Sequence, residues 1–194
     1  MKKISILIVI FCAVTLQGFS QNQADSSFYK STESKWLTKK TGMWNVTMTI
    51  QPTIDSKSII INGMEAQRNM IGAFCLHEIM QPSKGEAMPL FNRISALDYN
   101  FNETLWDYIS IDTRITAGIM FFNYHSSAGD SIVSYIQGFP HPDLGPKQTD
   151  RGKTVRVKNV VITIDENHDA VKQYWKLTDG VEWLAITYDY VRKQ

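Results

Sequence analysis

Residues 42–50 read Gly-Met-Trp-Asn-Val-Thr-Met-Thr-Ile, and from Trp44 onward apolar side chains alternate with polar ones. This period of two is typical of a β-strand that buries one face and exposes the other. Trp44, Val46, Met48 and Ile50 would then share one face and line the protein interior. The stretch therefore predicts an opening strand whose inner face is entirely apolar.

Similar strand-like runs follow almost without interruption, and no long helical pattern lies among them. Antiparallel strands joined by short turns account for such a sequence, so we expect an all-β fold of about ten strands in one domain, residues 42–194. The expected strands after the first are residues 59–70, 74–80, 91–99, 105–113, 119–124, 132–137, 155–164, 171–177 and 181–192.

The last strand ends with Tyr188-Asp189-Tyr190-Val191-Arg192, about 150 residues after Trp44. A closed antiparallel barrel would bring the first and last strands together and remove the unpaired edges of an open sheet. In such a barrel the Arg192 guanidinium can lie over the Trp44 indole. The sequence therefore predicts structural closure of the barrel by Trp44 and Arg192.

Residues 26–41 are the one plausible helix, and they end with Lys39-Lys40 before Gly42. Cations in the last turn and a glycine just beyond it are ordinary helix-stop chemistry. We therefore expect an N-terminal segment, residues 21–41, whose short helix packs against one end of the barrel.

Residues 1–20 have the pattern of a secretory signal peptide. Lys2 and Lys3 precede an apolar run over 4–16, and small residues, Gly18 and Ser20, stand where signal peptidase accepts them. The apolar run is too short to span a bilayer. We expect secretion across the inner membrane, a periplasmic or extracellular location, and no integral membrane segment after cleavage.

The charge balance is close to neutral, with 20 basic and 19 acidic residues. Loss of Lys2 and Lys3 with the leader would lower the formal net charge from +1 to −1. A near-neutral chain without basic runs lacks the electrostatic footprint of a nucleic-acid-binding protein. Cleavage would also remove Cys12 and leave Cys75 with no intrachain disulfide partner. We expect a monomer or a weak homodimer.

Charged residues on otherwise apolar strand faces are the candidate ligand-binding groups. Arg68 and Glu78 fall on neighbouring predicted strands, and a three-residue turn at 71–73 would make them diagonal neighbours on one face. Asp112 shares a face with aromatic residues. Such groups suit a polar anchor inside a hydrophobic cup, and structural ion pairs that tie the strands together are the favoured alternative. Aromatic residues complete the candidate ligand-binding set: Tyr99, Trp106 and Tyr188.

No catalytic or metal site is predicted, and no cofactor. His77, His125, His141 and His168 are scattered without ligand spacing. An enzyme would need Cys75 with His77 as a nucleophile and base, or carboxylates such as Glu78 and Asp112, in an open cleft.

Several short motifs along the chain occur together in a known family. They are Gly42-Met43-Trp44 after a short helix, Gly63 through Gly72-Ala73-Phe74, Tyr99-Asn100-Phe101-Asn102, Trp106, Ile111-Asp112 and Ile186-Thr187-Tyr188 to Arg192-Lys193. In these residues the chain resembles the secreted bacterial family known as domain of unknown function 1579. It departs from the family at Asn100 and Ser110, where the family usually has an aspartate and an aromatic residue. The resemblance implies a calycin-like barrel, related in shape to lipocalins and fatty-acid-binding proteins, and nothing catalytic.

By analogy with such barrels, we expect the chain to bind a small lipophilic or amphipathic molecule in the cell envelope. The main alternative is an interaction protein with a filled barrel, which would use the long loop over residues 138–152, or an exposed apolar patch, to contact a partner. A hydrolase-like enzyme is the remote alternative. Barrel volume distinguishes these hypotheses, because methionine and tryptophan side chains could fill a small interior.

Overall fold

The computed structural model describes residues 28–86, 88–114, 119–128, 131–141, 152–178 and 180–194. The predicted leader, residues 1–20, lies outside the described residues, and so does most of the predicted interaction loop, residues 142–151. Among the described residues, no helix has both the length and the apolar character that crossing a membrane requires.

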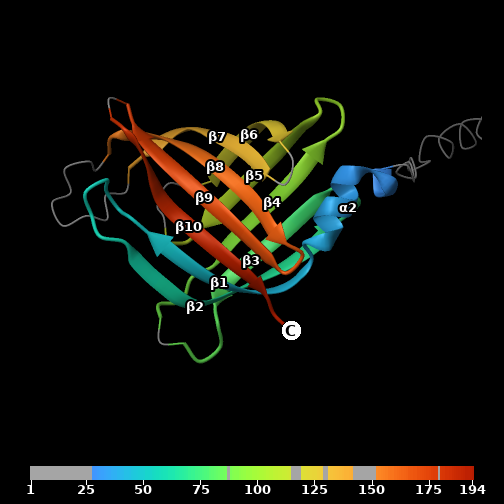
Figure 1. Ribbon diagram of the computed structural model, residues 1–194, viewed down its shortest axis with the longest axis horizontal. Coiled ribbons are helices and arrows are strands. Elements are labelled where there is room, and N and C mark those ends of the chain that lie inside the picture. Colours follow the sequence, from blue (N-terminus) through green and yellow to red (C-terminus); the bar gives the residue numbers. More distant parts are fainter. Residues whose placement is uncertain (1–27, 87, 115–118, 129–130, 142–151, 179) are drawn as a thin grey trace, which may run out of the picture.

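Ten strands make up nearly all of the described chain, as the period-two patterns predict (Figure 1). All neighbouring strands run antiparallel, which confirms the all-β antiparallel architecture. The strands are β1 (Gly42–Ile50), β2 (Ile59–Ile71), β3 (Cys75–Pro82), β4 (Arg93–Asn100), β5 (Leu105–Asp112), β6 (Ile119–Ala128), β7 (Ser131–Pro140), β8 (Thr154–Asp165), β9 (His168–Leu177) and β10 (Glu182–Arg192).

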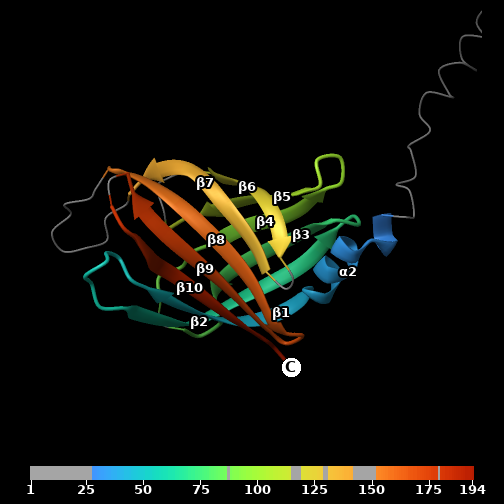
Figure 2. The ribbon, with the colours of Figure 1, turned by 45° about the horizontal axis from the view of Figure 1, so that its top comes forward.

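The strands pair in the order β1-β10-β9-β8-β7-β6-β5-β4-β3-β2, and β1 also pairs with β2. Each described strand therefore has two hydrogen-bonded neighbours, and the ring of pairings returns to its start. Figure 2 shows the sheet curled around an interior. Side chains on the inner face of each strand are consequently brought together in a single core.

The inner face of β1 is the one that the opening sequence predicts. Trp44, Val46, Met48 and Ile50 are all buried. A register shift in the β1–β2 ladder follows Val46, opposite Gly63, whose φ of +77° lies in the left-handed region. Glycine adopts this conformation without the strain that a side chain would cause, and a Cβ here would also lie 2.6 Å from the Glu86 side chain.

The helical segment ends at Lys39, two residues before the predicted end, and the predicted start at residues 26–27 lies outside the described residues. It consists of a 3₁₀ turn, η1 (Phe28–Lys30), and an α-helix, α2 (Thr32–Lys39), at the end of the barrel where β1 begins and β10 ends (Figures 1 and 2). We call this the helix end and the opposite one the far end. The Ser31 hydroxyl accepts the Ser34 N–H at 3.0 Å, so Ser31 caps α2 and explains why the helix begins there.

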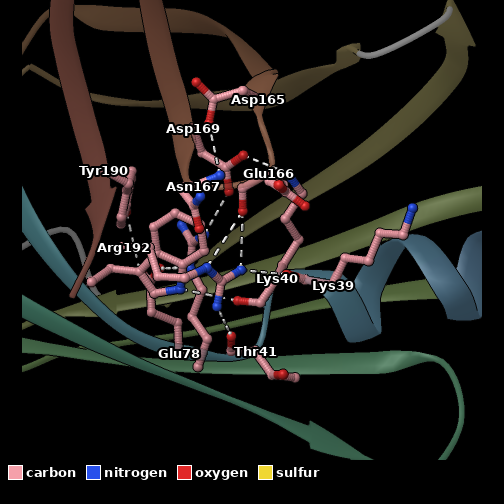
Figure 3. Close-up of polar contacts among 12 residues, drawn as sticks. Lys39, Lys40, Thr41, Glu78, Asp165, Glu166, Asn167, Asp169, Tyr190 and Arg192 are labelled. Carbon is pink, nitrogen blue, oxygen red and sulfur yellow. Dashed lines mark hydrogen bonds and ion pairs between the residues drawn. The ribbon is translucent and has the colours of Figure 1, made fainter. Parts of the chain in front are cut away.

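Arg192 joins this helix to the last strand. Its guanidinium lies 4.3 Å from the Trp44 ring centroid, the arrangement that the two chain ends predict. It also donates hydrogen bonds to the carbonyl oxygens of Lys39 and Thr41, both at 2.5 Å, and more weakly to that of Glu166 (Figure 3). The last residue of β10 thus binds one carbonyl that the end of α2 leaves without a helical partner, that of Lys39, and one just beyond the helix, that of Thr41.

Strands β4 and β5 depart from the usual arrangement of a sheet, in which apolar side chains face the core and polar ones face the solvent. In β4 the buried residues include Arg93 and Ser95, whereas Ile94 is exposed. In β5 Ser110 is buried and Ile111 is exposed. This part of the barrel therefore turns polar side chains inward and isoleucines outward. Polar groups consequently lie in the interior, and apolar side chains lie on the outer surface.

Candidate functional site

The centre of the site is the ion pair between Arg68 and Glu78. Strand β2 continues to Ile71, so the turn to β3 occupies 72–74 and not the predicted 71–73. Arg68 therefore lies directly opposite Glu78, and the prediction of a diagonal pair was wrong. The Arg68 Nε atom donates to Glu78 Oε2 at 2.8 Å, and both residues are buried.

A second carboxylate, Asp169 of β9, extends this pair. Arg68 Nη1 donates to Asp169 Oδ2 at 2.9 Å, while Lys40, just after α2, donates from Nζ to Asp169 Oδ1 at 2.5 Å. All three side chains are buried. Figure 3 shows Lys40, Asp169, Glu78 and Tyr190 clustered inside the helix end of the barrel.

Arg93 of β4 completes the cluster from the other side of Glu78. Its Nη2 atom donates to the Tyr108 hydroxyl at 2.7 Å and lies 3.7 Å from Glu78 Oε1. Its guanidinium also lies 4.5 Å from the ring centroid of Tyr188. The second terminal nitrogen, Nη1, has no hydrogen-bond partner among the described residues, although Arg93 is only 4% exposed. A buried donor without an acceptor typically costs about 1–3 kcal/mol, and more when it carries charge.

A cavity of about 50 Å³ lies within this cluster. One buried water molecule needs about 10–15 Å³ of cavity volume, so the space holds a few waters or a small polar group. It is far smaller than the roughly 300–1,000 Å³ of a pocket for a drug-sized ligand. Its lining includes apolar side chains such as Leu76 and Leu97. The polar and aromatic side chains that line it are Trp36, Lys40, Arg68, Glu78, Arg93, Ser95, Tyr108, Asn159, Asp169 and Tyr190.

The cavity is electropositive by formal charge, since three cations face two carboxylates. Burial alone would raise the pKa of Glu78, but the guanidinium groups of Arg68 and Arg93 outweigh burial and lower that pKa. Burial lowers the pKa of Lys40, and Asp169 opposes this only in part. Burial and the Glu78 charge both raise the pKa of Tyr190, whose hydroxyl donates to Glu78 at 3.3 Å. The site therefore keeps Glu78 ionised and Tyr190 protonated at neutral pH.

The remaining candidate residues lie elsewhere. Asp112 is at the far end of the barrel, where its carboxylate binds Arg114 at 2.6 Å. Tyr99 and Trp106 form an aromatic cluster at the helix end, in which Trp106 contacts Trp36 at a centroid distance of 5.5 Å. Tyr188 lies against the guanidinium of Arg93. Of the six predicted ligand-binding residues, only Arg68 and Glu78 line the cavity.

Sequence reasoning missed three charged groups of the site, namely Lys40, Arg93 and Asp169. For Arg93 a signal was present, because it alternates with isoleucine and alanine along β4. Asp169 and Lys40 gave no such signal, because their partners are more than 100 residues away in the sequence. Tertiary structure alone brings these residues together.

The enzymatic alternatives receive no support from the geometry. Cys75 and His77 lie on the outer face of β3, and both are only half-buried. Burial and the neighbouring Asp98 raise the pKa of the Cys75 thiol, which disfavours the nucleophilic thiolate. Glu78 and Asp112 bind separate arginines, and Asp112 does not line the cavity that Glu78 lines. Within the described ranges, no group of three histidine, cysteine or carboxylate side chains is placed to hold a metal ion.

Comparisons with known proteins identify the fold and nothing finer. No protein-family model and no curated protein matches the chain. The crystal structure of Rv2717c from M. tuberculosis has a TM-score of 0.51 and 12% identity, covering 84% of this chain and 99% of that one. A redesigned β-barrel has a TM-score of 0.39 and 11% identity over 81% of this chain and 95% of its own. A redesigned β-barrel bound to DFHBI has a TM-score of 0.29 and 13% identity over 84% of this chain and 100% of its own. The similarity to Rv2717c supports a β-barrel fold, and the two weaker ones carry no further argument.

Proposed function

We propose that this protein is a calycin-like β-barrel that binds a small molecule with an anionic head in the cell envelope. The observation that carries the proposal is the buried Nη1 donor of Arg93, in a residue that lines a cavity with a formal excess of one positive charge. A carboxylate would accept the hydrogen bond that this donor lacks. The resemblance to the domain of unknown function 1579 family and the signal-like residues 1–20 support the envelope location.

The size of the cavity limits what it takes. About 50 Å³ accommodates a carboxylate group but not the chain of a fatty acid. An amphipathic ligand would place its head against Arg93 and extend its apolar part past Trp36 and Lys40, the lining residues from the helical segment. In place of the expected lipophilic cup, we therefore propose a smaller site, whose ligand has a small anionic head and a short chain.

Isothermal titration calorimetry with hexanoate and 1-hexanol tests this proposal. The two probes share their chain length and differ in the charged head. We expect hexanoate to bind with a Kd of about 1 mM or lower, equivalent to −4 kcal/mol or better, and hexanol to bind at least tenfold more weakly. Failure of both probes to bind would contradict the proposal.

Substitution of Arg93 locates the binding site. Arg93→Met keeps most of the volume of the side chain and removes both its charge and its hydrogen-bond donors, so hexanoate should bind no better than hexanol. Arg156→Met is the control, since Arg156 is an exposed arginine of β8 that does not line the cavity. Retention of the hexanoate preference by Arg93→Met would show that the anion binds elsewhere.

A further inference from the structure

The outer surface of strands β3 to β6 carries a continuous apolar patch. Ile79 lies opposite Ile94, Ile94 opposite Ile111, and Ile111 opposite Ile119, in one row across four strands. A second row pairs Ile109 with Phe121. These six side chains are between 36% and 62% exposed. We call Ile79, Ile94, Ile109, Ile111, Ile119 and Phe121 the isoleucine patch.

The patch arises from the inverted polarity of this part of the sheet. Inward-facing polar residues such as Arg93 and Ser110 force their apolar strand neighbours outward, because successive side chains alternate between faces. Isolated exposed isoleucines are ordinary, but a contiguous set on one sheet face marks an interaction surface. No charged side chain lies within the two rows.

The charges beside the patch restrict its partner. Asp98 and Asp107 face each other across β4 and β5, on the same outer face and toward the helix end. Burial and the nearby Asp107 raise the pKa of Asp98, as two neighbouring carboxylates require. An acidic border repels anionic lipid surfaces and nucleic acid. The patch therefore fits an apolar protein surface that sets no carboxylates against Asp98 and Asp107.

The dimensions of the patch match a weak protein contact. Four strands about 4.8 Å apart and two rows about 7 Å apart give a few hundred square ångströms. The largest apolar patch on a typical monomer covers about 300–600 Å², and a stable complex buries about 800 Å² on each partner. The patch alone is therefore too small for a permanent dimer and large enough for a reversible one.

We propose that the isoleucine patch is the contact surface of a reversible homodimer, in which the β3–β6 faces of two copies pack against each other. Sheet faces that pack on each other lie about 10 Å apart, and the outward curvature of the barrel confines the contact to the patch. A two-fold axis sets the same patch on both copies. An axis running across the strands turns the copies end for end, so Asp98 and Asp107 of one copy lie away from those of the other. The alternative axis, along the strands, would cluster four carboxylates.

Sedimentation velocity of the purified protein between about 5 μM and 1 mM tests the proposal. We expect a reversible monomer–dimer equilibrium with a Kd in the micromolar to submillimolar range. Ile111→Lys should weaken it at least tenfold, because the symmetry places the new charge in the interface twice. Ile94→Lys repeats the test at the adjacent position, should one variant fail to fold.

Ile164→Lys is the matched control, since Ile164 is 52% exposed on β8 and lies outside the patch. It should leave the dimer unchanged, and circular dichroism should show a native β spectrum for every variant compared. A wild-type protein that stays monomeric at 1 mM would overturn the proposal. So would a dimer that both patch variants preserve, or patch-dependent binding to phosphatidylcholine vesicles without self-association.

Discussion

Replacement of Arg192 tests how the two ends of the chain hold the barrel together. In Arg192→Ala the cation–π contact with Trp44 is lost, worth about 0.5–2 kcal/mol for a partly desolvated pair. Hydrogen bonds to the carbonyl oxygens of Lys39 and Thr41 are lost as well, each contributing about 0.5–1.5 kcal/mol net. Water can replace part of these bonds, because Arg192 is partly exposed. We therefore expect a loss of about 2–3 kcal/mol in the free energy of unfolding.

Urea denaturation followed by tryptophan fluorescence measures this loss, and a thermal scan should show a midpoint lower by about 4–12 °C. Arg192→Lys should recover only part of the stability, because an ammonium neither stacks flat on an indole nor reaches several carbonyls at once. Arg156→Ala, an exposed arginine of β8, should change the midpoint little. An Arg192→Ala variant within 0.5 kcal/mol of the wild type would refute the closure argument.

Four further predictions concern the buried charges, the Cys75 thiol and the predicted leader. Arg68→Met leaves two buried carboxylates with fewer partners and should cost about 3–5 kcal/mol by urea denaturation; a loss below 1 kcal/mol would contradict the network. Because the folded-state pKa of Glu78 lies below its ordinary value of 4.5, its ionisation stabilises the fold above that pH, and this stabilisation is lost as pH falls through the folded pKa. The urea concentration at the midpoint of unfolding should therefore fall as the pH is lowered below 4.5, and it should fall less steeply in Glu78→Gln. Parallel pH curves for the two proteins would contradict this prediction. The Cys75 thiol, its pKa raised, should react with iodoacetamide at pH 7 more slowly than glutathione does, and an equal rate would argue for an activated thiol. Protein recovered from its native host should begin within a few residues of Gln21, and Met1 on soluble protein would contradict secretion.

The part of the site that was predictable from sequence depends on local geometry. Arg68 and Glu78 sit on consecutive strands, so strand alternation and one short turn are enough to place them on a common face. The predicted register of β2 against β3 was wrong because the turn begins one residue later, at Gly72, whose φ of +66° suits a tight turn. A shift of one residue in the turn changes which residues stand directly opposite.

The contacts of Asp169 with Arg68 and Lys40 were not predictable from the sequence. Asp169 is 101 residues from Arg68 and 129 from Lys40, and no local pattern encodes contacts at such separations. They form because the ring of strands places β9 and the end of α2 over the same part of the interior. The cost of burying each charge is offset only after these segments meet.

By itself, the sequence determined that the chain forms about ten strands, since apolar and polar side chains alternate with a period of two in nearly every segment. It also determined the contact of Trp44 with Arg192, because both residues stand at the ends of strands that closure would bring together. It did not determine which face of β4 turns inward, because alternation divides side chains into two sets without saying which is buried. The tertiary structure decided that question: Arg93 is buried where Glu78 and Tyr108 supply partners from other strands, and Ile94 is consequently exposed.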